Sequence, residues 1–288
     1  MNTSEITGHT RVAAVIGWPI DHSLSPTIHN AGFRSMGVDW TYVALPIPAG
    51  GCQPILELCR QGALGGLSVT MPHKTAVFEQ CDRLSPAAER LRSVNTVVRD
   101  SDGSLVGHST DGDGLLDSLR AEDVDVTDRT VLVLGWGGAA RSVTDALVRH
   151  RAGRIVISNR SGVDESERSV IAPDSSSIPW SRRNEVLASV DLVINCTSVG
   201  MGSFGEANSE DSPVDVADLR SGTVVTDLVY HPLSTPLLQG ARSRGCRVVG
   251  GLGMLIHQAA RQQTLWIGSE PDVAAMTDAA LRRLDAPR

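Results

Sequence analysis

The chain has 288 residues, of which 41% are hydrophobic, 20% are charged and 3% are aromatic, and its formal net charge is −7. The acidic balance excludes a nucleic-acid-binding protein, since no basic stripe is present to neutralise phosphates, and neither a signal-peptide pattern nor a membrane-spanning apolar run is present. The length suffices for two domains, and a core built from Val, Leu, Ile and Ala favours an α/β fold with buried parallel sheets.

The first informative segment joins a predicted strand to a predicted helix. The apolar run Val12–Ile16 indicates a buried strand that ends in a Gly/Pro turn. We expect a helix to follow, with Ser25 as its N-cap and Pro26 at its first helical position. The hydroxyls of Ser23 and Ser25 would then lie beside the positive end of that helix, where a carboxylate or a polyol could bind. A simple cap and turn explains the same residues equally well.

Strand-like and helix-like patterns alternate up to about residue 110, which favours an α/β domain with a mostly parallel sheet. The predicted strands are Val12–Ile16, Trp40–Leu45, Gly66–Thr70 and Val94–Arg99. The predicted helices lie near Ser25–Met36, Gln53–Cys59 and His73–Cys81. Gly112–Leu119 is predicted to be a helix that connects this domain to the next.

A second unit begins at Thr130 with a compact buried strand, Val131–Leu134, followed by a glycine-rich turn and a helical pattern through Val148. Further strands are predicted at Arg154–Ser158, Asp191–Asn195 and Val224–Leu228. Gly162–Ser177 predicts an exposed loop or an irregular helix, and Gly202–Ser212 predicts another polar loop. From Gly251 to Leu284 the pattern is helical.

Residues 135–140 match the G-x-G-x-x-G/A pattern of dinucleotide-binding turns, with Ala140 as the third small residue. Gly135 permits the tight turn, Gly137 lets the backbone approach a pyrophosphate, and the third small residue lets helix and strand pack closely. Because the pattern stands between a strong strand and a helix, dinucleotide binding is favoured over a simple turn.

The residues after the next strand, Asn159-Arg160-Ser161, bear on which dinucleotide binds. An NAD site usually places an acidic side chain there, to accept from the ribose 2′-hydroxyl. An arginine with neighbouring donors fits a 2′-phosphate instead, because guanidinium binds phosphate through charge-assisted hydrogen bonds. NADP is therefore the predicted cofactor, with a solvated strand-end arginine as the alternative. Asp164, Glu165 and Glu167 would repel a phosphate if they faced it.

Three further segments carry concentrated polar side chains at strand ends. Lys74 lies just beyond the strand Gly66–Thr70, Asn95 lies in the segment Ser93–Thr96, and Asp111 begins the connecting helix. Taken singly, Lys74 is a typical surface lysine and Asp111 is a typical N-cap. Beside a nicotinamide, a Lys–Asp pair makes chemical sense, because oxidising an alcohol by hydride transfer requires the hydroxyl proton to leave.

The cysteines are odd in number and scattered, with no C-x-x-C pair. They are Cys52, Cys59, Cys81, Cys196 and Cys246. This pattern predicts neither a disulfide framework nor a zinc site, and it indicates a reducing cytoplasm. His22 and His29 lack a third ligand at suitable spacing, so we expect no bound metal.

The chain resembles the shikimate dehydrogenase family in an ordered series of motifs along nearly its whole length. The motifs are Ser23–Pro26, Val69–Lys74, Asn95-Thr96, Thr110–Gly112, Gly135–Ala139, Asn159–Ser161, Asn195–Met201, Asp227–Tyr230 and Gly251–Met254, followed by Gln258. The resemblance implies reversible, NADP-linked reduction of 3-dehydroshikimate to shikimate in aromatic amino-acid biosynthesis. It also implies a substrate domain of residues 1–111, completed by C-terminal helices at 252–288, and a Rossmann-type NADP domain at 112–251.

The resemblance assigns a role to each matching position. Lys74 and Asp111 would be the acid–base pair at the reacting oxygen. The substrate ligands would be Ser23 and Ser25 at the carboxylate with Tyr230 nearby, and Thr70, Asn95, Asp111 and Gln258 at the ring hydroxyls. The cofactor would be lined by Gly135, Trp136, Gly137, Gly138, Ala139, Asn159, Arg160 and Ser161, with Leu228 and Gly251 near the nicotinamide.

Four positions depart from the commonest pattern of the family. Ser68 and Ser109 stand where Asn is frequent, His231 replaces a frequent Asn, and Asp164 stands where many NADP-using members have Arg or Lys. These departures leave open an NAD-linked quinate/shikimate dehydrogenase. A non-catalytic dinucleotide-sensing protein is a further alternative, against which the retained Lys–Asp pair argues. The expected partner is a small-molecule substrate, and a homodimer is left open.

Overall fold

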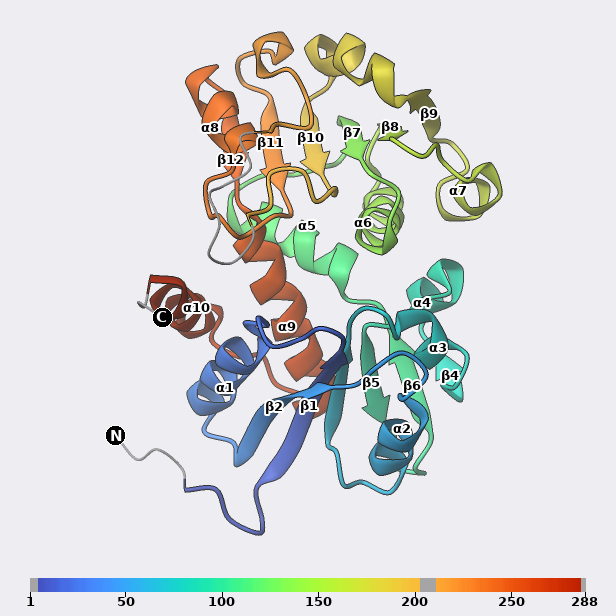
Figure 1. Cartoon of the computed structure of the whole chain (residues 1–288), viewed down its shortest axis with the longest axis vertical. Helices are drawn as coiled ribbons and strands as arrows, with labels where there is room; N and C mark the ends of the chain where they lie inside the picture. The colour runs from blue at the N-terminus through green and yellow to red at the C-terminus, as the bar shows by residue number, and fades with distance from the viewer. Residues whose placement is uncertain (1–4, 203–210, 286–288) are drawn as a thin grey trace. The chain divides into compact units, whose positions relative to one another are not determined.

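The computed structural model describes residues 5–202 and 211–285. The chain divides into two compact units, residues 1–110 with 256–288 and residues 111–255 (Figure 1). Each unit is built on a six-stranded sheet in which parallel pairing predominates. The predicted α/β class with mostly parallel sheets is therefore confirmed.

The sheet of the first unit has the strand order β2-β1-β3-β5-β6-β4. Its strands are β1 (Arg11–Gly17), β2 (Trp40–Pro46), β3 (Gly66–Val69), β4 (Arg83–Leu84), β5 (Thr96–Arg99) and β6 (Leu105–His108). β1 pairs in parallel with β2 and β3, whereas β5 is antiparallel to both β3 and β6. The hairpin between β5 and β6 closes with Asp100 N donating to Ser104 O, and Gly103 supplies the positive φ of 88° that the turn requires.

The helices of the first unit pack on this sheet around two clusters, an aliphatic one that includes Ile16, Leu67 and Val97 and another that includes Val15, Phe33 and Tyr42. They are α1 (Ser25–Met36), α2 (Gln53–Arg60), α3 (Lys74–Phe78), α4 (Pro86–Leu91) and α10 (Val273–Asp285), with α9 (Gly251–Ile267) continuing into this unit from the second. Figure 1 shows α1 and α10 side by side, in agreement with their many close residue pairs. The helical pattern predicted for Gly251–Leu284 forms two helices, because Gly268 adopts a φ of 82° that ends α9.

The prediction that Ser25 is the N-cap of α1 is wrong. Leu24 occupies the N-cap position without a side-chain hydrogen bond, so Ser25 is the first helical residue and Pro26 the second. The Oγ of Ser23 accepts from Ser25 N at 3.2 Å. The hydroxyl two residues earlier thus supplies the local turn that was expected of Ser25, and proline tolerates either early position because it has no N–H to satisfy.

The second unit has the strand order β12-β11-β10-β7-β8-β9, and all its pairs are parallel. Its strands are β7 (Thr130–Leu134), β8 (Arg154–Asn159), β9 (Ser176–Pro179), β10 (Leu192–Asn195), β11 (Val224–Asp227) and β12 (Arg247–Val249). Its helices are α5 (Asp111–Ala121), α6 (Gly138–Arg149), α7 (Glu165–Ile171) and α8 (Pro236–Ser243), with short 3₁₀ segments η1 (Trp180–Ser189) and η2 (Val216–Asp218). This is the strand order of dinucleotide-binding Rossmann folds.

Several short elements escaped the sequence patterns. β4, β6, β9 and β12 have two to four residues each, and α4 and α8 have six and eight. Periodicity cannot be recognised over so few positions. The stretch Gly162–Ser177 contains the regular helix α7, and the loop predicted for Gly202–Ser212 lies mostly outside the described residues.

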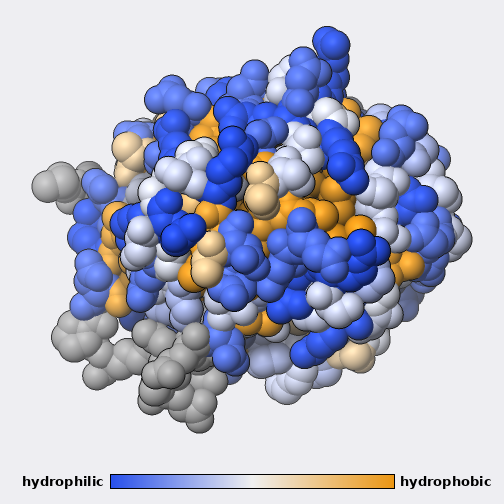
Figure 2. Space-filling view, turned by 90° about the horizontal axis from the view of Figure 1, so that it is seen from above, coloured by the Kyte–Doolittle hydropathy of each residue, from blue (hydrophilic) through white to orange (hydrophobic). Residues whose placement is uncertain are grey.

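The surface carries both hydrophilic and hydrophobic residues. In the face drawn in Figure 2, hydrophilic residues predominate around a central patch of hydrophobic ones. Over the two described stretches, no helix has both the length and the apolar character needed to cross a bilayer.

Candidate active site

The ends of β1 and β3 bring two predicted substrate segments to one edge of the first sheet. The strands run in parallel with Ile16 opposite Val69, so the loops that follow them start side by side. Thr70 N donates to Ile16 O at 3.0 Å. A Cβ at Gly17 would lie 2.4 Å from Thr70 Cγ2, so glycine is required for this close approach. Ser23 and the Thr70 segment therefore leave the same edge of the sheet.

Asn95 joins that edge because β5 is antiparallel to β3. Ser68 of β3 pairs with Thr96, the first residue of β5, so Asn95 lies where β3 ends. Val94 N donates to Lys74 O at 3.1 Å, which ties the start of α3 to the same segment. Lys74 is half-buried there as the first residue of α3.

Thr110 links Asn95 to two other predicted residues. Asn95 Nδ2 donates to Thr110 Oγ1 at 2.9 Å, and Asn95 Oδ1 accepts from Thr110 N at 2.9 Å. Thr110 Oγ1 in turn donates to Gln258 O at 3.4 Å. Asp111 follows Thr110 directly in the chain and begins α5. The first unit thus gathers buried Asn95 and Gln258 with half-buried Thr70 and Lys74 along one sheet edge.

The second unit contains a pocket of about 410 Å³ at the carboxyl ends of its strands. It is lined by Gly135, Trp136, Gly137, Asn159, Arg160, Ser161, Trp180, Arg183, Cys196, Thr197, Ser198, Val199, Asp211, Ser212 and Pro213. The strand order reverses between β7 and β10, and such a switch point is where open α/β sheets bind ligands. Six of the predicted cofactor residues line this pocket.

The glycine turn after β7 has the geometry that the sequence pattern requires. Gly135 has a φ of 106°, and a Cβ there would lie 3.3 Å from backbone atoms of Cys196. At Gly137 and Gly138 an added Cβ would meet no atom within 4 Å. The protein's own packing therefore does not demand glycine at those two positions, whereas a phosphate group close to the backbone would. The site fits a dinucleotide.

Each acidic side chain near Arg160 has a partner within its own unit. Asp164 caps α7 by accepting from Ser166 N and Glu167 N, and hydrogen bonds led by that from the Ser166 side chain lower its pKa. Glu165 accepts from Arg168 Nε at 2.6 Å. These bonds satisfy the carboxylates that were a concern for phosphate binding.

Glu167 connects α7 to the glycine turn. Its Oε2 accepts from Trp136 Nε1 at 3.2 Å, and its Oε1 accepts from Arg141 Nη1 at 2.5 Å. The unusual tryptophan of the turn is consequently 8% exposed and held in place. Arg160 itself is exposed and lines the pocket beside Asn159 and Ser161.

The residues predicted near the nicotinamide follow β11 and begin α9. A Cβ at Gly251 would lie 2.5 Å from Leu228 O, so only glycine fits where this turn meets α9. Asp227 at the end of β11 is fully buried, and burial raises its pKa. Its oxygens accept from Thr235 Oγ1 at 2.7 Å and from Asn195 Nδ2 at 2.9 Å, which fixes the backbone before Leu228 and Tyr230.

Sequence reasoning assigned no role to several residues of the cofactor pocket. Arg183 of η1 lies over the Trp180 ring, 4.4 Å from its centroid, and donates to Pro213 O. These residues follow β9, which the sequence did not predict. The Thr197 side chain lies in the motif after β10 that the family resemblance matched, so the signal was present there.

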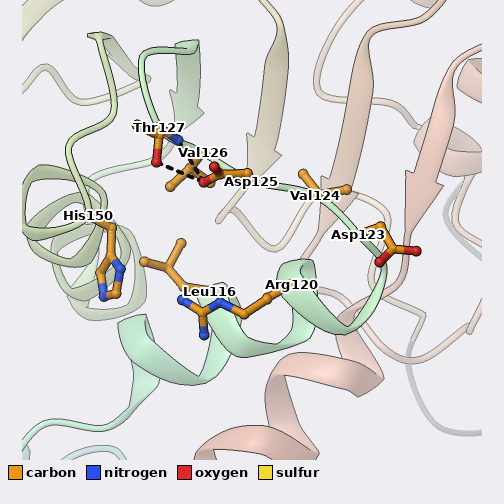
Figure 3. Close-up of a pocket in the computed structure, with 8 residues that line it drawn as sticks. All are labelled: Leu116, Arg120, Asp123, Val124, Asp125, Val126, Thr127 and His150. Atoms are coloured by element: carbon orange, nitrogen blue, oxygen red, sulfur yellow. Dashed lines mark hydrogen bonds between the residues drawn. The ribbon is translucent and has the colours of Figure 1, made fainter.

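A second pocket of about 500 Å³ lies in the same unit, away from the predicted site residues (Figure 3). Arg120 and Leu116 reach it from α5, and His150 reaches it from the end of α6. Its polar groups are paired locally, as Thr127 Oγ1 donates to Asp125 at 2.9 Å and Arg120 pairs with Asp117 at 2.8 Å. None of its eight lining residues is a predicted site residue.

No cluster of three or more His, Cys, Asp or Glu side chains suited to a metal ion occurs within residues 5–202 and 211–285. The five cysteines are all free thiols.

Comparison with known proteins connects both units to one family. The model of the shikimate dehydrogenase substrate binding domain matches residues 15–97, and that of the shikimate 5′-dehydrogenase C-terminal domain matches residues 251–281. A shikimate dehydrogenase (NADP(+)) from Citrifermentans bemidjiense is 41% identical over 292 residues, covering 98% of this chain and 98% of that protein.

Two solved structures illustrate the structural similarity. The shikimate 5-dehydrogenase of Thermus thermophilus, in complex with NADP(H) and shikimate, matches with a TM-score of 0.82 and 33% identity over 94% of this chain and 99% of that one. The quinate dehydrogenase of Corynebacterium glutamicum, in complex with NAD, matches with a TM-score of 0.84 and 29% identity over 94% and 99%. The fold alone does not separate the two activities.

Proposed function

The chain belongs to the shikimate dehydrogenase family, and from that premise we propose that it catalyses the reversible, NADP-linked reduction of 3-dehydroshikimate to shikimate. The observation that carries the proposal is the 41% identity to a shikimate dehydrogenase (NADP(+)) over 98% of both chains. The shared sheet edge that holds Thr70, Lys74 and Asn95 supports it independently.

We propose that the first unit binds the substrate and the second the cofactor. Ser23 and Ser25 hydroxyls would hold the substrate carboxylate, with Tyr230 nearby. Thr70, Asn95 and Gln258 would hydrogen-bond the ring hydroxyls, since each offers donors and acceptors to a polyol. The positions of Thr70, Asn95 and Gln258 along one edge of the first sheet support this assignment.

Lys74 and Asp111 are proposed as the acid–base pair. In the reductive direction the Lys74 ammonium gives a proton to the carbonyl oxygen as negative charge develops on it. In the oxidative direction the neutral amine takes that proton from the hydroxyl. The Asp111 carboxylate would hold the same hydroxyl in line and stabilise the charged lysine.

One feature of the sequence supports a chemical role for Lys74. It is the single lysine among the 26 Lys and Arg residues of the chain. Arginine serves at every other basic position, yet guanidinium stays protonated and cannot exchange a proton near neutral pH. A lysine at this one place fits a position that needs a titratable amine.

Bound NADP would supply or accept the hydride of the reaction. Gly135, Gly137 and Gly138 would lie along its pyrophosphate, and Arg160 with Ser161 and Asn159 would hold the 2′-phosphate. An NAD site needs a carboxylate that accepts from the ribose 2′-hydroxyl. The Asp164 carboxylate instead accepts from the backbone of α7, which supports NADP over NAD. Leu228 and Gly251 would lie near the nicotinamide.

We also make a proposal about the cellular compartment and the oligomeric state of the protein. We infer a cytoplasmic protein from the five free thiols, which suit a reducing compartment. A homodimer is the assembly to be tested, by light scattering on the purified chain.

Replacing the lysine tests the function. Lys74→Ala should lower kcat for shikimate oxidation by about two orders of magnitude or more. Lys74→Arg keeps the charge but should be similarly impaired, because arginine cannot release its proton. A wild-type enzyme without shikimate turnover would refute the proposed function, and full activity of Lys74→Arg would refute the acid–base role.

A further inference from the structure

A directed chain of hydrogen bonds lies beneath the substrate edge of the first unit. Tyr42 OH donates to Ser68 Oγ at 2.6 Å, and Ser68 Oγ donates to Gln262 Oε1 at 2.6 Å. Gln262 Nε2 donates to Thr96 Oγ1 at 3.0 Å, and Thr96 Oγ1 donates to Asn95 Oδ1 at 2.8 Å. All five side chains are buried, with Thr96 at 0% and Gln262 at 2% exposure.

Gln262 sets the direction in which the hydrogen bonds of this series run. Its Nε2 also donates to the backbone oxygen of Asn95 at 3.2 Å, and a carbonyl oxygen can only accept. The amide is therefore fixed with Oε1 toward Ser68 and Nε2 toward Thr96. Thr96 receives a proton from Nε2, so its own hydroxyl proton points to Asn95 Oδ1.

This hydrogen-bond direction determines how the Asn95 carboxamide is oriented. Its Oδ1 accepts from Thr96 Oγ1 and from Thr110 N at 2.9 Å, while its Nδ2 faces Thr110 Oγ1 at 2.9 Å. The Thr110 hydroxyl can donate or accept, but the Thr96 hydroxyl proton and the Thr110 N–H both need an acceptor, so only one of the two carboxamide orientations satisfies them. Hydrogen-bonded chains polarise one another in a low-dielectric interior, which strengthens this choice.

We propose that Thr96 and Gln262 are positioning residues that fix the orientation of the Asn95 carboxamide toward the substrate. The inference rests on the proposed function, in which Asn95 binds a ring hydroxyl. Neither residue touches the substrate in this proposal. They act together with Thr110 N, which donates to the same oxygen, by holding the amide in one of its two orientations.

The chain of hydrogen bonds also explains one departure from the family pattern. Ser68 stands where Asn is frequent, and from the sequence it shortens a polar side chain near the substrate strands. In the structure its hydroxyl bridges Tyr42 and Gln262. Ser68 thereby belongs to the buried chain that ends at Asn95.

A pair of substitutions at Thr96 tests the proposal. Thr96→Val has nearly the same shape but no hydroxyl, so Asn95 Oδ1 and Gln262 Nε2 each lose a partner. We expect KM for shikimate to rise about 10-fold, with kcat and KM for NADP nearly unchanged, since a ring-hydroxyl contact binds ground and transition states alike. Thr96→Ser restores the hydroxyl and should return KM to within about 2-fold of the wild type.

Asn95→Ala is the reference variant, and it should raise KM for shikimate at least as much as Thr96→Val. If Asn95→Ala raises KM while Thr96→Val lowers only thermal stability, Thr96 is merely structural and this inference fails alone. Should Thr96→Val not fold, Gln262→Met provides the same comparison from the other side of the bond. Absence of shikimate turnover in the wild type would overturn the proposed function and this inference together.

Discussion

His29 should make the folded chain sensitive to mild acid. This residue of α1 is fully buried, and its ring stacks on Tyr42 with centroids 4.0 Å apart and an interplanar angle of 6°. Its Nδ1 lies 3.1 Å from Gln263 Nε2, a donor that a neutral imidazole can accept from and an imidazolium cannot. Burial lowers the pKa of His29 to about 3.

The sign of the effect follows from proton binding. Between about pH 6.5 and about pH 3 the unfolded chain carries a proton on His29 that the folded chain does not. Stability is therefore present above the unfolded pKa and declines as the pH falls below it, by about 1.4 kcal/mol per pH unit. From about pH 7 to about pH 5 the contribution of His29 is a loss of ~2 kcal/mol in the free energy of unfolding.

Urea unfolding of the wild type and of His29→Phe, measured across this pH range, isolates the contribution. Phenylalanine keeps an aromatic ring against Tyr42 but cannot be protonated. The pH dependence should be weaker in the variant by ~2 kcal/mol over the range, while the contribution of His108, whose pKa burial also lowers, cancels between the two. His9→Gln, at an exposed position, is the matched control and should behave as the wild type. Identical pH dependence in wild type and His29→Phe would show that this histidine is not the source of the acid sensitivity.

Three further predictions concern the glycine turn after β7, the arginine proposed at the 2′-phosphate and the turn that begins α9. Gly137→Ala should leave Tm unchanged because the added Cβ meets no atom within 4 Å, yet raise KM for NADP about 10-fold or more; an unchanged KM would argue against a pyrophosphate there. Arg160→Gln should raise KM for NADP by about 10- to 100-fold, because a charge-assisted hydrogen bond contributes ~1.5–3 kcal/mol, and should leave KM for NAD nearly unchanged. Equal effects on the KM values of both cofactors would contradict a 2′-phosphate contact. Gly251→Ala places a Cβ 2.5 Å from Leu228 O, so a thermal melt should show destabilisation of about 1–3 kcal/mol, and a wild-type Tm would show that the turn can yield.

The sequence predicted best where the signal is local. The run Val131–Leu134 and the glycines after it specify a buried strand and a tight turn within ten residues, and the structure has both. The sequence predicts Ser25 as the cap because serine before proline is a typical capping pattern. The backbone geometry instead places Leu24 at the N-cap, with no side-chain hydrogen bond.

Contacts between distant segments could not be predicted from the sequence. Gln262 and Thr96 are 166 positions apart, and no local sequence pattern indicates that their side chains form a hydrogen bond. The Asn95 amide was recognised as a candidate from its place at a strand end, but its orientation depends on that distant partner. Asp164 looked unfavourable for a phosphate in the sequence, and only the structure shows that it caps α7.

The proposed activity is tested most directly by comparing kcat/KM for shikimate and quinate, each with NADP and with NAD, on the purified full chain. We expect the highest value for shikimate with NADP. A higher value for quinate with NAD would contradict the proposal and favour a quinate dehydrogenase. Absence of turnover in all four combinations would instead indicate a dinucleotide-binding protein without catalysis.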